Sequence, residues 1–350
     1  MTAVDLVTAV LVAGITAYAV LGGADFGAGF WDLTAGGARR GARIRGLIKR
    51  SMSPVWEANH VWLIFVLVIF WTGFPTAFGT VMSTLYVPLF LAAVGIIFRG
   101  AAFALRGEAA TIGEARALGA TFALSSVLVP FFFGATVGAI VSGQVPAPPG
   151  GGDPWDSWTN ETSLYVGVLA VALGAYLSAV FLAGDAVRAE QPDLIEACRR
   201  RALGAGAVAG LLAIGGIFVI RDDAPDLYDG LTSGLGLAVV IGSAAAGLLT
   251  LWLVWDRRFG PARFTSALAV GAIIVGLAVA QSPDFLPGVL TLQDAAASED
   301  ALVPLLVAVV IAAAILIPAL TYLFRLTLRG TLDTEFRPIV AADRGKEEER

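Results

Sequence analysis

The sequence predicts an all-α polytopic membrane protein, and three observations support this fold class. Of the 350 residues, 57% are hydrophobic and only 15% are charged, with a mean hydropathy of +0.80. Soluble domains carry about 25% charged residues, so this composition is typical of a chain that lies largely in lipid. Long apolar runs recur along the chain, and the segments that connect them differ strongly in their content of basic residues.

Each long apolar run is interpreted as one membrane span, because about 20 apolar residues in a helix cross the hydrocarbon core. The first run is interpreted as a span and not as a signal peptide, since neither a basic segment nor a cleavage site accompanies it. The sequence predicts nine spans, over 4–24, 55–74, 80–98, 117–141, 163–184, 203–220, 231–254, 264–281 and 302–325.

The basic residues predict the orientation of the chain. All Lys and Arg except Arg221 fall in connecting segments on one side, for example in 39–50 and from Arg325 onward. Cytoplasmic segments are enriched in Lys and Arg, so this side is expected to face the cytoplasm. We therefore predict an external N-terminus and a cytoplasmic C-terminus, which agrees with an odd number of spans.

A weak internal repeat suggests how the spans are grouped. AVLGGAD at 19–25 ends the first span and AVFLAGD at 179–185 ends the fifth, with Gly14 and Gly174 at matching positions. Chance similarity in a chain rich in Ala, Gly and Val is the alternative. The repeat predicts two four-helix bundles in the same orientation plus one extra helix. The expected units are a partner-facing first bundle over 1–142, an external loop over 143–162, a second bundle over 163–282, an external loop over 283–301, a ninth helix over 302–328 and a cytoplasmic tail over 329–350.

Acidic residues at the ends of spans are the first candidates for a functional site. Asp25 follows the first apolar run, Glu57 begins the second and Asp185 ends the fifth, all toward the expected cytoplasmic side. A charged side chain costs about 2.5–3.5 kcal/mol at a helix centre in the membrane, so such groups are neutral, paired or hydrated. Two interpretations are open, namely a path for protons from the cytoplasm and interfacial carboxylates that pair with the basic segment 39–50.

The second span opens on SPVWEANHVWLI, residues 53–64, which adds further polar groups to the same region. Helical spacing places His60 on one face with Glu57 and with Trp56. Arg99 ends the third span on the same side, either as the partner of one of these acids or as an anchor at the membrane surface. The residues interpreted as a proton pathway are Asp25, Glu57, Asn59 and His60.

The chain has few ligands for a metal or a haem. His60 is the only histidine, Cys198 is the only cysteine, and one of the three methionines is Met1. His60 is therefore expected to form hydrogen bonds or to pass protons, and redox chemistry would need a partner subunit that holds the cofactor. We predict no catalytic, cofactor-binding or metal-binding residue in this chain. The small net charge of −5 indicates no nucleic-acid partner.

Four motifs resemble those of subunit II of the cytochrome bd-type quinol oxidases. They are GADFGAGFWDL (23–33), SPVWEANHVWLI (53–64), FRGAAFALRG (98–107) and VLTLQDAAAS (289–298), in the order in which the family has them. The resemblance covers essentially the whole chain. It implies a subunit of a respiratory complex in the bacterial plasma membrane. This complex oxidises membrane quinol and reduces O₂ to water without pumping protons.

The resemblance also implies partners and cofactors. Two b haems and one d haem are expected in subunit I, a homologous nine-helix chain that pairs with the first bundle and binds the quinol. Protons for water are expected to enter from the cytoplasm. Small single-helix subunits, membrane lipids and a bound quinone are compatible with the resemblance.

Residue roles follow from the resemblance position by position. Glu57 matches the acidic position of proton uptake, Asp25 matches the first-helix aspartate, and Trp62 matches a tryptophan near a hydrophobic O₂ route. His60 departs from the glutamine that many members carry, which leaves its hydrogen-bond network open. The expected structural or charge partners are Trp56, Arg99, which matches the arginine that ends the third helix, and Asp185.

Two other classes of function stay open on the sequence. A proton-coupled secondary transporter also has repeats and intramembrane acids, although its helices are usually broken at the membrane centre. A purely structural assembly subunit would have the same composition and spans, but none of its carboxylates would move protons.

Overall fold

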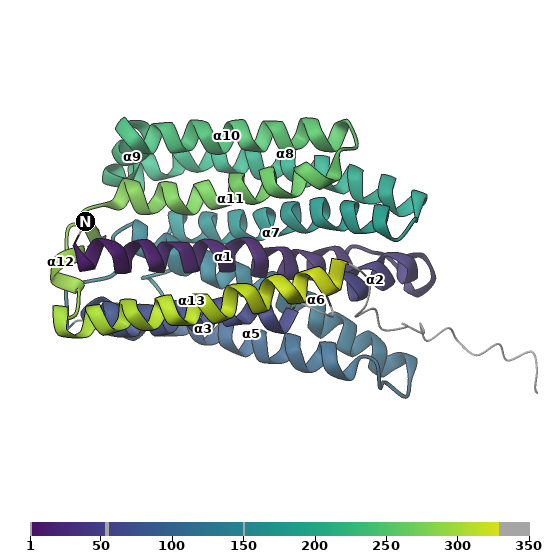
Figure 1. Cartoon of the computed structure of the whole chain (residues 1–350), viewed down its shortest axis with the longest axis horizontal. Coiled ribbons are helices and arrows are strands. Elements are labelled where there is room, and N and C mark those ends of the chain that lie inside the picture. The colour runs from purple at the N-terminus through teal and green to yellow at the C-terminus, as the bar shows by residue number, and fades with distance from the viewer. Residues whose placement is uncertain (1, 53–55, 150, 329–350) are drawn as a thin grey trace, which may run out of the picture.

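The computed structural model describes residues 2–52, 56–149 and 151–328, which form long helices that lie side by side (Figure 1). The elements are α1 Ala3–Leu33, α2 Ala38–Met52, α3 Trp56–Gly73, α4 Pro75–Thr84, α5 Tyr86–Leu105, α6 Ile112–Val141, α7 Glu161–Arg188, α8 Pro192–Asp223, α9 Pro225–Thr232, α10 Gly234–Trp255, α11 Phe259–Gln281, β1 Asp284–Leu286, β2 Leu290–Thr291, α12 Leu292–Ala295 and α13 Glu299–Leu328.

Within these described ranges, nine helices are long and apolar enough to cross a membrane, namely α1, α3, α5, α6, α7, α8, α10, α11 and α13. This confirms the predicted fold class. Several helices extend beyond the predicted spans, because backbone hydrogen bonding continues through polar residues outside the apolar run. The predicted span over 80–98 differs most, since its first residues belong to α4 and the spanning helix is α5. Pro75 begins α4 and Pro88 lies in the first turn of α5, where a missing N–H is tolerated.

The basic segment after the first span forms a helix, α2, which the sequence analysis treats as a connection. Its apolar residues Ile44, Leu47, Ile48 and Met52 are buried. Their spacing places them on one side of a helix, which is the pattern of an amphipathic helix. This amphipathic pattern fixes α2 against the main core.

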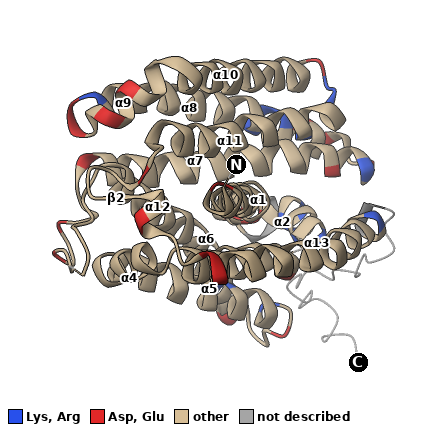
Figure 2. Cartoon of the chain, turned by 60° about the vertical axis from the view of Figure 1, so that its left-hand side comes forward, with Lys and Arg blue, Asp and Glu red and all other residues tan. Residues whose placement is uncertain are grey.

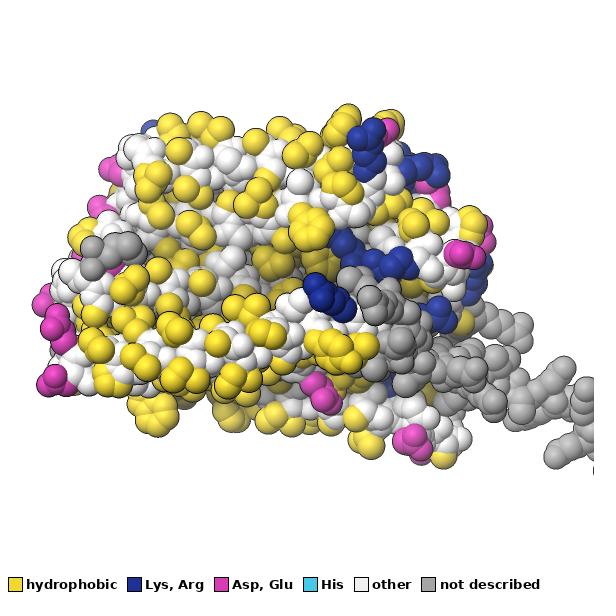
Figure 3. All heavy atoms as spheres, viewed as in Figure 1, with side chains coloured by type: hydrophobic (Ala, Val, Ile, Leu, Met, Phe, Trp, Pro, Cys, Tyr) yellow, Lys and Arg dark blue, Asp and Glu magenta, His cyan; other side chains and the backbone are white. Residues whose placement is uncertain are grey.

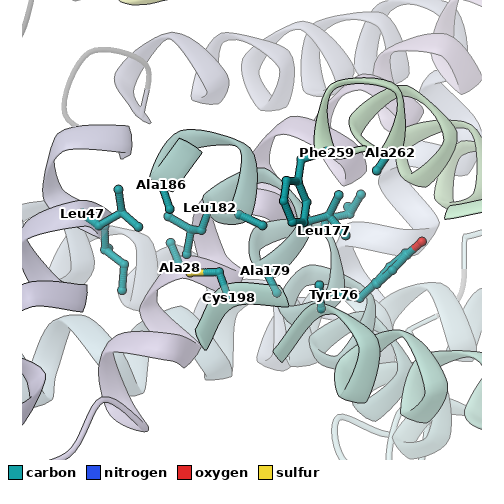
Figure 4. Close-up of a cluster of buried hydrophobic side chains, with 14 of the residues drawn as sticks. Ala28, Leu47, Tyr176, Leu177, Ala179, Leu182, Ala186, Cys198, Phe259 and Ala262 are labelled. Atoms are coloured by element: carbon teal, nitrogen blue, oxygen red, sulfur yellow. The ribbon is translucent and has the colours of Figure 1, made fainter. Parts of the chain in front are cut away.

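Helix α7 is the centre of the packing. It contacts α1, α6, α8 and α11, and its side chains form the main hydrophobic cluster (Figure 4). Helices α1 and α6 belong to the predicted first bundle, yet both pack on α7, which belongs to the predicted second bundle. The division into two bundles therefore stays a prediction. The cluster includes Ala28 from α1, Leu47 from α2, Leu177, Ala179, Leu182 and Ala186 from α7, Cys198 from α8, and Phe259 and Ala262 from α11.

Small residues allow α1 and α7 to approach closely. A Cβ atom on Gly27 would lie 1.9 Å from the carbonyl oxygen of Gly174, so that only glycine fits there. One helical turn further along α1, Trp31 Nε1 donates a hydrogen bond to the carbonyl oxygen of Ala175 at 2.8 Å. Close backbone contact and interhelical hydrogen bonds are the forces that hold helices together in lipid.

Charged residues gather at the two ends of the helices (Figures 2 and 3). Lys and Arg concentrate at the end where α1, α5, α7 and α10 finish, which we call the basic end. The opposite end, where α9 and α12 lie, is called the acidic end. That the basic end faces the cytoplasm stays a prediction of the positive-inside rule.

Residues 282–298 at the acidic end, which we call the strap, contain the β1–β2 hairpin and α12. The ring of Phe285 stacks on Phe70 at 5.4 Å between centroids, and Leu286 is buried. The amide of Ala297 donates a hydrogen bond to the carbonyl oxygen of Gly73 at 2.8 Å. The strap therefore ties the start of α13 to the corner between α3 and α4.

Candidate functional site

A cluster of buried polar side chains lies between α1, α3, α5 and α6. It consists of Asp25, Asn59, Arg99 and Ser126, which are between 1% and 7% exposed. Burying such groups is costly unless each finds a hydrogen-bond partner. Each residue comes from a different helix, so the cluster forms only when the four helices pack.

Asp25 and Asn59 form the direct link between α1 and α3. Asn59 Nδ2 donates to Asp25 Oδ2 at 2.5 Å, and the same nitrogen lies 3.4 Å from the carbonyl oxygen of Leu21. The amide can orient the carboxylate without competing with it for a proton. This pair brings together two of the four residues interpreted from the sequence as a proton pathway.

Arg99 connects the pair to α6. Its Nη2 donates to the carbonyl oxygen of Asp25 at 3.1 Å, and its Nε donates to Ser126 Oγ at 3.1 Å. The guanidinium also lies 4.8 Å from the ring centre of Phe26 and 5.3 Å from that of Phe122. Buried cations need such compensation, which here comes from oxygen atoms and from the negative faces of aromatic rings.

His60 lies beside this cluster among aromatic rings. Its ring centre is 6.1 Å from those of Tyr18 and Phe26 and 6.2 Å from that of Trp56. Among the residues that the structure describes, neither His60 Nδ1 nor the Tyr18 hydroxyl has a hydrogen-bond partner, although both atoms are buried. Buried polar atoms of this kind ordinarily bond to ordered water or to a neighbouring chain.

A cavity of about 80 Å³ opens beside Asp25, between α1, α3, α7 and the end of α13. Its polar lining consists of Asp25, Ser51, Asn59, Ser178 and Asp185. A water molecule needs about 10–15 Å³ and two or more polar partners, so this site cavity can hold water. Asp25 and Asp185 end the two matching segments of the predicted internal repeat, and both line the same cavity.

Asp185 differs from Asp25 in its partners. It accepts hydrogen bonds from Arg188, one turn along α7, and from Arg263 at the start of α11. Its side chain is 16% exposed, compared with 7% for the Asp25 residue. Asp185 therefore forms ion pairs at the basic end, and it also lines the site cavity.

Glu57 lies outside this arrangement. It occupies the first turn of α3 with its side chain exposed, whereas Asn59, two residues later, points inward. Residues two apart on a helix point in very different directions, so Glu57 and Asn59 cannot both face Asp25. Trp56 contacts Phe103, and the partly buried Trp62 contacts Phe65.

A second buried aspartate, Asp32, is absent from the residues that the sequence analysis selects. It is 4% exposed and accepts hydrogen bonds from Arg45, at 2.6 Å, and from Arg106. Burial lowers the pKa of the neighbouring Lys49 below its usual range, and the charge of Arg106 lowers it further. The spacing of seven residues from Asp25, which is visible in the sequence, places both aspartates on one side of α1.

Potential metal ligands are scattered among the residues that the structure describes. In the described part of the chain, no three His, Cys, Asp or Glu side chains are grouped so that they could hold a metal. Cys198 lies inside the main hydrophobic cluster and His60 is surrounded by rings.

The fold and the site together define a multi-pass helical membrane protein that encloses an aspartate, an amide and an arginine within its spans. The model of one family, cytochrome bd terminal oxidase subunit II, matches residues 4–327. The chain belongs to this family, which confirms the resemblance seen in its motifs.

Individual relatives agree with this assignment. A Bacillus subtilis (strain 168) protein, provisionally described as a cytochrome bd menaquinol oxidase subunit II, is 25% identical over 269 residues, or 73% of each chain. The cytochrome bd ubiquinol oxidase subunit 2 of the same organism is 27% identical over 114 residues, or 33% of each chain. The solved bd oxidase from Geobacillus thermodenitrificans is 28% identical, with a TM-score of 0.75, and the match covers 94% of this chain and 99% of that chain.

Membership of the family has direct consequences. The chain is a multi-pass subunit of a quinol oxidase complex in the bacterial plasma membrane, and a subunit I is its implied partner. This membership argues against a proton-coupled secondary transporter. The family is also consistent with haems that lie in another subunit.

Proposed function

We propose that this subunit conducts protons from the cytoplasm toward subunit I, where quinol is oxidised and O₂ is reduced to water. The observation that carries the proposal is the position of Asp25, a buried carboxylate that lines the site cavity. The basic end, at which the cavity lies, is proposed to face the cytoplasm. The two b haems, the d haem and the quinol belong to subunit I in this proposal.

The route begins at the rim of the site cavity, beside Ser51 and Asp185. Water in the cavity would pass a proton to Asp25, whose carboxylate Asn59 holds in place. Asn59 keeps this carboxylate oriented, and His60, the next residue along α3, is proposed to take the proton onward. Glu57, exposed in the first turn of α3, is proposed to act in proton uptake at the cytoplasmic surface.

The neighbouring apolar groups have a separate proposed role. Trp62 lies on α3 in contact with Phe65, and its face is proposed to border the access route for O₂. Trp56 is proposed to support the site because its ring packs on that of His60. Arg99 is proposed to support it because its Nε donates a hydrogen bond to Ser126. Small subunits, lipids and a structural quinone are further partners that this proposal allows.

The test uses Asp25→Asn and Glu57→Gln in the complex purified with subunit I. Both substitutions keep the size of the side chain and remove its ability to carry a proton. Positioned acids and bases raise reaction rates by about 10²–10⁴-fold. The rates of quinol-driven O₂ consumption and of proton uptake in vesicles should therefore each fall by about tenfold or more. The matched control is Asp226→Asn, which changes an exposed carboxylate at the acidic end.

Haem absorption bands distinguish a blocked path from a failure to assemble. In the proposed role, both variants keep the bands of the complex while turnover falls. If assembled Asp25→Asn and Glu57→Gln complexes both turn over as the Asp226→Asn complex does, the subunit is structural and the proton route is wrong.

A further inference from the structure

A second cavity, of about 430 Å³, lies at the basic end between α7 and the connection from α10 to α11. Four arginine side chains line it, with the backbone of the first turn of α11 and the exposed Val187. We propose that this arginine pocket binds a phosphate group, and specifically the headgroup phosphate of an anionic phospholipid. Its arginines are Arg188, Arg257, Arg258 and Arg263.

The carboxylates near the pocket do not neutralise it. Asp185 is shared by Arg188 and Arg263, while Asp256 pairs with Arg258 at 2.7 Å. Glu196 is shared by Arg257 and Arg199, each at 3.2 Å. Five guanidinium groups thus share three carboxylates, which leaves two positive charges in excess.

One guanidinium donor at the pocket wall is not used. Arg263 Nε is buried and has no hydrogen-bond partner among the described residues. A Cβ on Gly184 would lie 3.0 Å from this nitrogen, so the glycine makes room for the guanidinium at the pocket wall. Arginine presents five donors in a planar fork that matches the oxygens of a phosphate.

The start of α11 adds donors of a different kind. The helix begins at Phe259, and no side chain caps its first turn. The amides of Phe259 and Gly260 precede the helical hydrogen-bond ladder, and both residues line the pocket. Such amides, with the positive end of the helix dipole, attract phosphate.

The surroundings of the pocket favour a lipid as the source of the phosphate. Trp252 and Trp255 are 54% and 68% exposed, as is typical of rings at the level of lipid headgroups. Phe264 and Leu268 follow on one face of α11 and are 79% and 64% exposed, so acyl chains can lie against them. A free phosphate ion would use the arginines but not this apolar face.

The test compares delipidated complex, containing this chain and subunit I, with added lipids by native mass spectrometry and thermal unfolding. The pocket variant is Arg257→Gln/Arg258→Gln, because both side chains are largely exposed and their loss should not prevent folding. The matched control is Arg116→Gln/Arg200→Gln, which removes two exposed arginines of the basic end that do not line the pocket.

Phosphatidylglycerol should bind to the wild type and to the control and raise the Tm of both. The pocket variant should bind it about tenfold more weakly, because two charge-assisted contacts are lost. Phosphatidylcholine serves as the zwitterionic comparison and should bind more weakly to the wild type.

Inorganic phosphate alone distinguishes the two sources of the ligand. A rise in Tm with inorganic phosphate that matches the rise with phosphatidylglycerol, and that the pocket variant lacks, would assign the pocket to free phosphate and overturn the lipid. Equal binding of phosphatidylglycerol by the pocket variant and the control would overturn the site itself. Neither result depends on proton uptake, so the test is independent of the proposed function.

Discussion

Arg99 is the largest side chain that the structure buries completely, with 1% of the residue exposed. Its positive charge is compensated by the carbonyl oxygen of Asp25, the hydroxyl of Ser126 and two aromatic rings. These contacts involve α1, α5 and α6 together. Arg99 therefore holds the helices around Asp25 in place, apart from any part in moving protons.

Replacing Arg99 by Met should destabilise the complex. The substitution removes the hydrogen bonds from the guanidinium to the Asp25 carbonyl oxygen and to Ser126 Oγ, and hydrogen bonds of a charged group contribute about 1.5–3 kcal/mol each. Thermal unfolding of the purified complex, followed by haem absorption, should show a lower Tm. Arg99→Lys should give an intermediate value, because an ammonium group keeps the charge but cannot reach two partners as a planar fork does. Arg116→Met, at an exposed position, should change stability by no more than about 0.5 kcal/mol. An Arg99→Met complex as stable as that control would contradict this role.

The sequence identifies the residues of the site better than it predicts their contacts. Asp25, Asn59 and Arg99 stand out in the sequence because polar side chains within apolar runs are energetically costly in a membrane. Which of them meet depends on how α1, α3 and α5 pack, and no local spacing encodes that. The exposed position of Glu57 and the ion pairs of Asp32 follow from the same packing.

At the scale of elements, hydropathy predicts the existence of the spans well and their ends poorly. Apolar runs mark the part of a helix that lies in lipid, but hydrogen bonding carries α1 and α8 beyond it. Hydropathy does not predict α2, because its many basic residues lower the mean hydropathy of a helix that has an apolar side. It does not separate α4 from the following span, because the residues of α4 are themselves largely apolar. The strap belongs to a predicted loop, and its turns depend on contacts with α3 and α4.

The crossing of α1 and α7 gives a prediction about a single methyl group. Gly27→Ala places a Cβ against the backbone of Gly174, which cannot move aside as a flexible side chain would. Overpacking of this kind costs about 1–3 kcal/mol, so the yield of assembled complex and its Tm should fall. Gly79→Ala in α4 is the control, because nothing lies within 4 Å of the added carbon. It should be neutral or stabilising by up to about 1 kcal/mol. Equal Tm values for the two variants would mean that the helices separate readily at this crossing.

For the whole molecule, burial is distributed very unevenly among the spans. Helices α6 and α7 are the most buried, while α13 is the least buried and α3 and α8 follow it. Large apolar side chains such as Ile64 and Trp71 on α3 and Ile315 on α13 are exposed. In a membrane this surface is covered by lipid or by another subunit. Subunit I is expected on the predicted first bundle, residues 1–142.

The proposed location of all haems in subunit I predicts how the absorption spectra of the isolated chain and of the complex should differ. This chain, purified alone, should show no haem bands, because it has a single histidine and the proposal places all three haems in subunit I. The complex with subunit I should show both b and d bands. Haem in stoichiometric amount on the isolated chain would contradict the assignment of all three haems to subunit I. Pigment analysis of both preparations, normalised to protein, makes the comparison.

The strap has a consequence for how the chain is made. Phe285 and Ala297, which are synthesised near the end of translation, bind to Phe70 and Gly73, which emerge early. Contacts between distant parts of a chain form slowly, and an early segment without its partner is prone to misassembly. The corner between α3 and α4 therefore stays without these contacts until the strap has been synthesised. A ribosome that stalls before residue 283 would leave that corner without its cover.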